Sequence, residues 1–364
     1  MPPIAPLDQL DATRFERASV LKRLTAASRQ LAELKGACAS IPHAGILINA
    51  LGMQEAKDSS AIENIVTTHD ELFRDAAFPE GGSAAAKEVL RYRQALRVGY
   101  EAVNRTKLLT VNDILAIQRE LERNDAGFRR VPGTVLQDNL GRTVYTPPSP
   151  EVVPGMMADL ERFINNSSGF NADPLIRLAL IHHQFESIHP FYDGNGRTGR
   201  IINVLYLLAQ GLLDIPILYM SRHIVRTKSE YYRLLQAVRD EGVWEEWVEY
   251  MLTAIETTAR EGIEMVGAIK TALLETKHRI RDAHRAIYSQ DLINSLFAHP
   301  YTKIRFVEQD LGVSRITATK YLDILTADGI LSKHRVGRAN YYINQRLTAI
   351  LTAAPSDATP AGSR

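Results

Sequence analysis

One short segment, His189–Arg200, reads HPFYDGNGRTGR and combines residue types that can act together on a phosphate chain. The glycines of Gly194–Gly196 allow a tight turn that presents successive backbone N–H groups outward. A helix that begins directly after this turn, near Arg197 or Thr198, would add the positive end of its dipole. Arg197 and Arg200 then lie on one face of its first turn. Guanidinium groups beside such a turn predict a binding site for a di- or triphosphate.

Two further side chains of the segment suit a reaction at such a phosphate chain. Asp193 places a carboxylate before the turn, and Mg²⁺ prefers oxygen ligands that it shares with substrate phosphates. His189 ends the incoming helix, where an imidazole can take a proton from an attacking hydroxyl. Together these groups indicate phosphoryl or nucleotidyl transfer, and the residues alone do not distinguish the two reactions.

Two glycine-rich alternatives share part of this pattern. Gly194, Gly196 and Gly199 match the dinucleotide-binding fingerprint G-x-G-x-x-G, and Asp214 follows at about the expected distance. That fingerprint comes after a strand, however, whereas 175–188 has apolar residues at helical spacing. A kinase glycine loop fails similarly, because the strand that would carry its lysine is missing.

The histidines around the segment give a third alternative, a zinc site. His182, His183, Glu186 and His189 form a loose cluster of metal-binding residue types. Neither HExxH nor HxxEH is present, so the zinc signal is weak. His182 and His183 are instead expected to pack within a helix or to face solvent.

The elements that must position the segment are predicted to be helices. Apolar residues at helical spacing occur over 15–35, 175–188, 198–213 and 244–279. The stretch 201–220 approaches the length of a membrane span, but polar residues and a proline interrupt it. We therefore expect a buried helix followed by a loop there, and no membrane partner.

The best strand signal is 133–148, GTVLQDNLGRTVYTPP. Residues 134–136 and 143–145 flank a polar turn with Asp138–Asn139 and Gly141, which predicts a β-hairpin. An isolated two-stranded hairpin is marginally stable, so it should lie across the helical body. The alternative, that the segment is only a connector, stays open.

The region 301–346 differs from the helical body. Its pattern is a short helix, a glycine turn, a second helix with a serine N-cap, and two short strands around a basic turn, which is the outline of a winged helix. Eight Lys/Arg and four Asp/Glu give this region a net charge of +4, while residues 1–300 sum to −3. The expected elements are 304–311, Gly312, Ser314 with 316–327, 330–332 and 340–343.

The composition excludes several classes of protein. The chain has 364 residues, 45% hydrophobic and 23% charged, with a net charge of +1, which excludes collagen, mucin-like stalks and wholesale disorder. The balanced charge argues against a protein that mainly coats nucleic acid or membrane. Its one cysteine, Cys38, excludes an internal disulfide and thiolate zinc sites, which favours a reducing, cytoplasmic location. No signal peptide is visible.

The segment His189–Arg200 resembles the motif of the Fic (Fic/DOC) family, H-x-F-x-[DE]-G-N-G-R-x-x-R, and agrees with it at every fixed position. The resemblance covers about 35–255. It implies a mainly α fold, a Fic-type helical bundle with a β-hairpin flap, to which this chain adds a C-terminal winged-helix domain. It also implies a nucleotidyltransferase that transfers AMP from ATP to a hydroxyl of a protein (AMPylation) and releases pyrophosphate.

The resemblance assigns a role to each part of the segment. His189 would be the base that activates the target hydroxyl, and Asp193 would hold Mg²⁺. Tyr231–Tyr232 resembles a pair that lines the nucleobase pocket, although packing between helices accounts for these tyrosines equally well. The residues expected to bind ATP are Gly194, Asn195 and Gly196 as an anion hole, Arg197 and Arg200 at the β- and γ-phosphates, Thr198, Gly199 and Tyr231.

Two segments outside the motif fit the same family. The 133–148 hairpin lies where Fic proteins carry a flap that docks the target protein by strand addition, and Tyr145–Pro148 resembles the end of that flap. Ser59–Asn64, SSAIEN, matches the family's inhibitory pattern [ST]-x-x-x-E-[GN].

The inhibitory residues expected from this match are Ser59, Glu63 and Asn64. A bidentate pair of Glu63 with Arg200 would occupy the donors that should bind the γ-phosphate. ATP would then bind with its α-phosphate poorly oriented for in-line attack.

Six regions are expected along the chain. They are an N-terminal arm and helix at 1–34, a helical region with the inhibitory motif at 35–110, the catalytic core at 111–255, a helical linker at 256–290, the winged helix at 291–346 and a disordered tail at 347–364.

Other functions stay open on the sequence alone. One is a DNA-binding transcriptional regulator with a Fic sensor domain, although winged helices also dock proteins. Another is removal of AMP from a modified protein, with Glu63 positioning the water. Auto-AMPylation and a homodimer are further expectations. The residues that would meet DNA are Arg315, Thr317, Thr319, Lys320, Lys333, Arg335 and Arg338.

Overall fold

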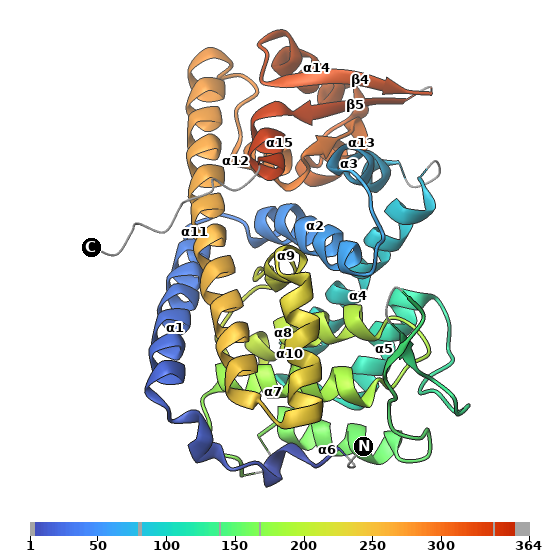
Figure 1. Cartoon of the computed structure of the whole chain (residues 1–364). Coiled ribbons are helices and arrows are strands. Elements are labelled where there is room, and N and C mark those ends of the chain that lie inside the picture. The colour runs from blue at the N-terminus through green and yellow to red at the C-terminus, as the bar shows by residue number, and fades with distance from the viewer. Residues whose placement is uncertain (1–3, 79–81, 138–139, 167–168, 338, 354–364) are drawn as a thin grey trace.

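The computed structural model of the chain is mainly helical, as predicted (Figure 1). It describes residues 4–78, 82–137, 140–166, 169–337 and 339–353. Of the expected disordered tail, 347–364, residues 354–364 lie outside the described residues. The expectation is wrong for 347–352, which belong to helix α15 (Gln345–Thr352) and bury Leu347 and Leu351. Buried apolar side chains from helices along the whole described chain form one connected core.

Two adjacent helices, α7 (Pro174–Ile188) and α8 (Asn195–Ala209), lie at the centre of the core. Asp173 caps α7 by accepting a hydrogen bond from the Leu175 N–H at 2.8 Å, and a proline follows at the first helical position. Every residue of α7 after the proline is buried. Packing on all sides of these helices therefore fixes the turn between them, which carries the motif.

The longest helix, α11 (Trp244–Ala283), has 40 residues and so spans about 60 Å. Figure 1 shows it running along one side of the molecule, with α1 (Ala18–Ala39) beside its lower part. Both helices were predicted, and their ends differ from 15–35 and 244–279 by a few residues. α11 continues without a break through the position of the predicted boundary between core and linker.

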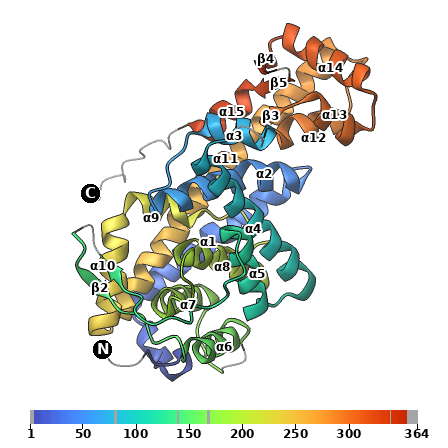
Figure 2. The same ribbon diagram turned by 90° about the vertical axis from the view of Figure 1, so that its right-hand side faces the viewer.

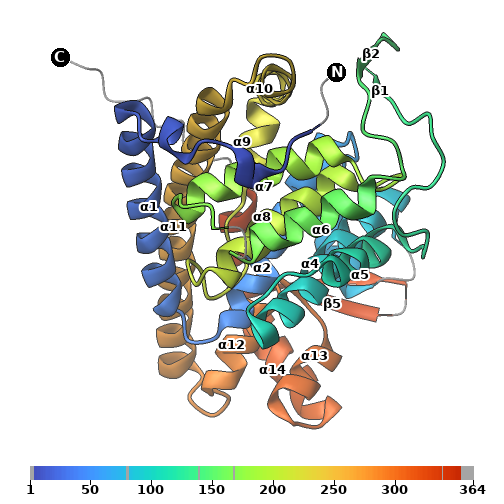
Figure 3. The same ribbon diagram turned by 90° about the horizontal axis from the view of Figure 1, so that it is seen from below.

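Most of the remaining helices of the body surround α7 and α8 (Figure 3). The helix that carries the inhibitory pattern, α2, contacts α4, α8 and α9. The surrounding helices are α2 (Ala44–Ile62), α4 (Ala84–Thr106), α5 (Val111–Glu122), α6 (Val153–Ile164), α9 (Met220–Arg226) and α10 (Lys228–Glu241). The short helix α3 (His69–Ala77) instead contacts α4 and strand β3 (Tyr301–Thr302).

The predicted hairpin is present as two very short antiparallel strands, β1 (Leu136–Gln137) and β2 (Thr143–Tyr145). Tyr145 is buried and donates its hydroxyl hydrogen to the Ser187 carbonyl at 2.8 Å. Val135 and Val144 are 40% and 45% exposed. The expectation that the hairpin lies across the body is therefore wrong, because only its base packs and the rest projects (Figure 3). Asp138–Asn139 of its turn lie outside the described residues.

The C-terminal unit contains the elements that the sequence predicts, and all but one end within a residue or two of the expected positions. The exception is β4, which was expected at 330–332 and continues to Val336, so residues expected in the basic turn pair with β5 instead. Its sheet is antiparallel with strand order β3-β5-β4, and β4 and β5 form the hairpin after the second helix. Whether this unit is a winged helix stays a prediction. Its elements are α12 (Gln290–Ala298), β3 (Tyr301–Thr302), α13 (Ile304–Leu311), α14 (Arg315–Ala327), β4 (Leu331–Val336), β5 (Ala339–Asn344) and α15 (Gln345–Thr352).

The C-terminal unit packs on α2 and α3 (Figure 2). The Tyr301 hydroxyl donates to an Asp70 carboxylate oxygen at 2.7 Å, and Lys303 Nζ donates to the Ala77 carbonyl at 2.6 Å. On α2, the buried Gln54 amide donates to the Leu351 carbonyl. The helix with the inhibitory pattern thus lies between the α7–α8 centre and the C-terminal unit.

The stretch 201–220 forms most of α8 and a loop that leads to α9, as expected. In the part of the chain that the structure describes, no helix is long and apolar enough to cross a membrane.

Candidate active site

The turn between α7 and α8 forms the base of the candidate site. α8 begins at Asn195, earlier than the expected start near Arg197 or Thr198, because Gly194 adopts a left-handed conformation (φ 79°) and serves as its N-cap. A Cβ at Gly194 would also come within 2.5 Å of Glu122 Oε1, so glycine is required twice over. The first-turn N–H groups of α8 have no partner within the helix, and they form the positive end of the helix dipole.

The side chain of Asn195 holds this turn in shape. Its Oδ1 accepts a hydrogen bond from the Phe191 N–H, and its Nδ2 donates to the Phe191 carbonyl, both at 2.9 Å. Both residues are buried. Since the amide is used within the loop, Asn195 can contribute only its backbone N–H to the expected anion hole.

His189 is the C-cap of α7 and has a left-handed backbone (φ 47°). Burial lowers the pKa of His189 to about 4, and the positive charges of Arg239 and Arg129 add to this effect. The imidazole is therefore neutral at pH 7 and able to accept a proton.

Arg129 is a residue of the site that the sequence analysis missed. It is 2% exposed, and its Nε donates to the His189 carbonyl at 2.8 Å. The same guanidinium reaches the Ile188 carbonyl and, at the end of the hairpin segment, the Pro148 carbonyl. Arg129 thus joins the hairpin base to the backbone that carries His189. No sequence pattern distinguishes it from other arginines, because its partners are carbonyls contributed by distant segments.

Arg200 is bound by residues at the C-terminal end of α2. Its Nη2 donates to Glu63 Oε1 at 2.9 Å and to the Ser59 carbonyl at 3.0 Å, while Nε donates to Ser59 Oγ at 2.8 Å. The predicted contact of Arg200 with Glu63 is present, but it is not bidentate, because it uses Nη2 alone and Ser59 accepts from Nε and Nη2. Burial alone would raise the pKa of Glu63, but the Arg200 guanidinium outweighs it and the pKa lies below its usual value.

The Glu63 carboxylate lies against the first turn of α8. A Cβ at Gly196 would collide with Glu63 Oε1 and come within 2.9 Å of Arg200 Nη1. Glycine at this position therefore lets an oxyanion approach the helix N-terminus closely. About 35% of the Glu63 side chain is still exposed.

Arg197 contacts a different set of residues from Arg200. Its guanidinium, 3% exposed, pairs with Glu88 and, at 3.0 Å, with Glu122 Oε1. Asp193 Oδ1 lies 3.7 Å from Arg197 Nη2. The two arginines lie three residues apart at the start of α8, as expected, but their partners differ, because α4 and α5 supply carboxylates to one and α2 supplies the partners of the other.

Asp193 is the residue expected to hold Mg²⁺. Its side chain is 77% exposed, and its Oδ1 accepts a hydrogen bond from the Gly194 N–H at 2.7 Å. An exposed carboxylate beside an anion-binding turn fits a hydrated Mg²⁺ that is shared with phosphates. Among the described residues, no three His, Cys, Asp or Glu side chains form a metal cluster, which such a shared ion does not need.

Three residues expected to bind ATP lie deeper than the turn. Thr198 is fully buried, and Gly199 packs against Phe185 and Glu186 of α7. Tyr231 is 2% exposed and its hydroxyl lies 2.8 Å from His182 Nε2. Their assignment to ATP stays a prediction.

The two neighbouring histidines of α7 are packed within the core. His182 Nδ1 lies 3.1 Å from the Asn203 amide, and His183 Nε2 lies 3.1 Å from the Leu235 carbonyl. Burial lowers the pKa of each to about 3. The expectation of packing is confirmed for both.

The residues expected to meet DNA are only partly available. Lys333 pairs with Asp323 at 2.7 Å, and Arg335 Nε donates to the Gly337 carbonyl at 3.0 Å. Lys303, counted in the +4 charge, contacts the body instead. Arg338 lies outside the described residues. DNA binding by this region stays a prediction. Lys333 and Arg335 are exposed, but Lys333 is paired with an acidic side chain.

Comparison with known proteins identifies related sequences along most of the chain. Residues 21–101 match the Fic/DOC family N-terminal domain, residues 108–207 match the Fic/DOC family, and residues 273–347 match the C-terminal domain of protein adenylyltransferase SoFic-like.

Similar proteins include named adenylyltransferases. Protein adenylyltransferase fic-1 of Caenorhabditis elegans is 30% identical over 164 residues, which is 45% of this chain and 30% of that protein. A probable protein adenylyltransferase of Aquifex aeolicus is 27% identical over 49% of this chain and 54% of its own length. The matches thus span from under a third to about half of these relatives.

A solved structure with the same fold covers nearly the whole chain. The Fic family protein from Desulfovibrio desulfuricans G20 has a TM-score of 0.55 and 22% identity, over 94% of this chain and 97% of that one. At this level of identity the likeness establishes the fold.

Proposed function

Because the chain belongs to the Fic/DOC family, we propose that it is a protein adenylyltransferase, an enzyme that transfers AMP from ATP to a hydroxyl side chain of a target protein. The hydroxyl oxygen attacks the α-phosphorus, the bond from this phosphorus to the bridging oxygen breaks, and pyrophosphate leaves. The names of the relatives support this reaction over γ-phosphoryl transfer, which the residues alone leave open.

His189 takes the proton of the attacking hydroxyl. Its lowered pKa keeps the imidazole unprotonated at neutral pH, and its helix-capping position, fixed by Arg129, supports a constant placement beside the turn. The α8 N-terminus and Arg200 bind the phosphates of ATP. Mg²⁺ held by Asp193 would neutralise phosphate charge when bound.

The hairpin is the proposed docking site for the target. Its short strands leave exposed backbone and the exposed side chains of Val135 and Val144 for pairing with an extended segment. Its base is fixed next to the motif through Tyr145 and Arg129, so a docked hydroxyl is brought toward His189.

The position of Glu63 carries the proposal. Its carboxylate accepts a hydrogen bond from Arg200 and fills the space next to Gly196. A phosphate oxygen of ATP would need the same donor and the same space. The same donors cannot serve both anions, so Glu63 restrains the enzyme. An internal carboxylate on these donors also supports their assignment as an anion-binding site.

The test is AMP transfer by three versions of the full chain. Glu63→Gly should raise incorporation from labelled ATP and Mg²⁺, into itself or proteins of a lysate, about 10-fold or more, because one charged hydrogen bond is removed. Intact mass should show the addition of one AMP. His189→Ala in the Glu63→Gly background should abolish it. Addition of a phosphate, or no addition by any version, would refute the proposal.

The reverse reaction is the second candidate. The 35% exposure of Glu63 leaves room for a water molecule at its carboxylate, which favours a role in hydrolysis of the AMP ester. Release of AMP from a modified protein that requires Glu63 would identify this activity.

A further inference from the structure

The end of α2 that carries Glu63 is a defined turn. Asn64 has a left-handed backbone (φ 63°), its N–H donates to the Ala61 carbonyl at 3.1 Å, and the Ile65 N–H donates to the Ser60 carbonyl at 3.0 Å. This is a Schellman motif, in which the left-handed position accepts Gly or Asn. The Glu63 backbone is therefore placed by the turn immediately around it.

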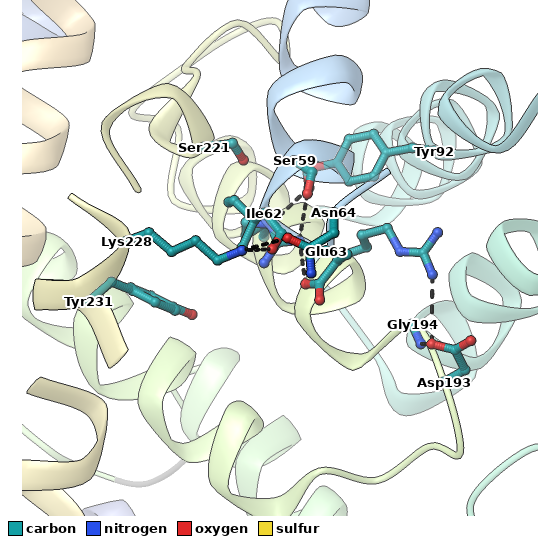
Figure 4. A network of polar contacts seen from close by, with 12 residues as sticks. Ser59, Ile62, Glu63, Asn64, Tyr92, Asp193, Gly194, Ser221, Lys228 and Tyr231 are labelled. Carbon is teal, nitrogen blue, oxygen red and sulfur yellow. Dashed lines mark hydrogen bonds and ion pairs between the residues drawn. The ribbon is translucent and has the colours of Figure 1, made fainter. Parts of the chain in front are cut away.

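One distant side chain binds this turn on both sides of Glu63. Lys228, the first residue of α10, donates from Nζ to the Ile62 carbonyl at 2.6 Å and to Asn64 Oδ1 at 3.2 Å (Figure 4). Ile62 is the last residue of α2, and the final carbonyls of a helix have no partner within it. A cation at this end also interacts favourably with the helix dipole.

The restraint thus depends on two anchors of different kinds. Arg200 holds the Glu63 carboxylate itself, together with Ser59. Lys228 forms no hydrogen bond with that carboxylate and instead fixes the backbone that presents it. If the turn frays, the carboxylate loses its placement even though its own partner is intact.

We propose that Lys228 is a positioning residue that stabilises the turn at the end of α2, and that its hydrogen bonds to this turn determine how strongly Glu63 restrains AMP transfer. This rests on the proposed function, since it describes the control of the same site. Any binding event that draws Lys228 from the turn would release the restraint.

The experiment compares Lys228→Ala and Lys228→Arg in the wild-type and Glu63→Gly backgrounds of the full chain. Lys228→Ala should raise AMP transfer several-fold, to a level below that of Glu63→Gly. Lys228→Arg keeps the donor and the charge and should stay within about twofold of wild type. In the Glu63→Gly background, Lys228→Ala should change neither kcat nor KM for ATP, because there is no restraint left to release.

A matched control variant and a second measurement separate stabilisation of the turn by Lys228 from a general effect of removing a lysine. Lys270→Ala removes an exposed lysine on α11 and should leave transfer unchanged. Hydrogen exchange of residues 60–66 should be faster in Lys228→Ala and unchanged in Lys270→Ala, whatever the activity.

Three results would overturn the inference. Transfer and exchange at wild-type levels in Lys228→Ala would show that the turn does not need the lysine. A loss of activity when Lys228→Ala is added to Glu63→Gly would make it a nucleotide ligand. If Lys228→Arg changed AMP transfer as much as Lys228→Ala does, the cause would be a fold defect and not the loss of the donor. If Glu63→Gly itself transfers no AMP, the proposed function fails. Hydrogen exchange of residues 60–66 would still test whether Lys228 stabilises the turn.

Discussion

At the residue scale, the two arginines of the motif have separate tasks although they are one helical turn apart. Arg200 is bound by Ser59 and Glu63 of α2, whereas Arg197 is neutralised by Glu88 and Glu122. A guanidinium that is buried between carboxylates mainly fixes structure, and removing either partner leaves an uncompensated charge. In the proposed function, phosphate binding by this turn is therefore assigned mostly to Arg200 and the N-terminus of α8.

His189 gives a prediction about pH. A base with a pKa near 4 loses its proton-accepting form only when pH falls through about 4, and not through the ordinary value near 6.5. The kcat/KM for AMP transfer should therefore stay nearly constant from pH 7 to about pH 5 and decline below that. The measurement uses Glu63→Gly, so that titration of Glu63 does not contribute. A decline centred near pH 6.5 would contradict the assignment.

At the element scale, α2 is attached to its neighbours along its length and not only at Glu63. Glu55 is fully buried and accepts hydrogen bonds from the hydroxyls of Tyr92 and Ser221, which come from α4 and α9. Asp58 pairs with Arg222 at 3.2 Å. These contacts make the restraining helix a stable part of the body, so release of Glu63 is expected to begin at the last turn of α2.

Glu55 predicts how stability depends on pH. Burial raises the pKa of Glu55 to about 7, although hydrogen bonds oppose this, so the folded state holds a proton that the unfolded state releases near 4.5. The stabilisation that the protonated Glu55 carboxyl gives the folded state is complete below about pH 4.5, and it is lost as pH rises through 7. The contribution of Glu55 to stability should therefore fall between pH 5 and pH 8, whereas the buried His182, His183 and His189, whose pKa values lie below the usual value, contribute in the opposite direction.

The difference in Tm between Glu55→Gln and wild type isolates this contribution, and it should shift by several degrees in favour of Glu55→Gln as pH rises from 5 to 8, because the amide does not ionise. Glu33→Gln, an exposed change on α1, should leave the pH dependence as it is in the wild type. Equal pH dependence of Tm in wild type and Glu55→Gln would contradict the buried titration.

At the scale of the whole molecule, α11 joins the catalytic body to the C-terminal unit as one continuous helix (Figure 1). The C-terminal unit also contacts α2 and α3 on either side of the inhibitory turn. Its surface against α3 is aromatic, with the rings of Phe73, Tyr301 and Tyr341 in contact. This unit therefore supports the helix that carries Glu63.

Tyr301 tests that support. Tyr301→Phe removes the hydroxyl that donates to Asp70 and should cost about 1 kcal/mol, measured as a lowered Tm in thermal unfolding of the full chain. Tyr321→Phe is the control, because no described residue lies within hydrogen-bond distance of its hydroxyl. An equal Tm for both variants would mean that the Tyr301 hydroxyl contributes nothing to docking.

The sequence by itself determined the mainly helical class and the motif segment with its base, carboxylate and anion-turn chemistry. These follow from local rules, since apolar spacing, glycine conformations and capping act over a few residues. Even the earlier start of α8 is local, because it depends on the left-handed Gly194. The pairing of Glu63 with Arg200, 137 residues apart, was expected only from the family resemblance.

The tertiary structure decided which partner each charged group finds. Arg129 joins the hairpin to His189, Arg197 meets carboxylates from α4 and α5, and Lys228 reaches the inhibitory turn. In each case the partners are far apart in the chain, and the sequence around each partner does not predict the contact. Long charged side chains on helices can reach several positions, and only the packing of those helices selects one.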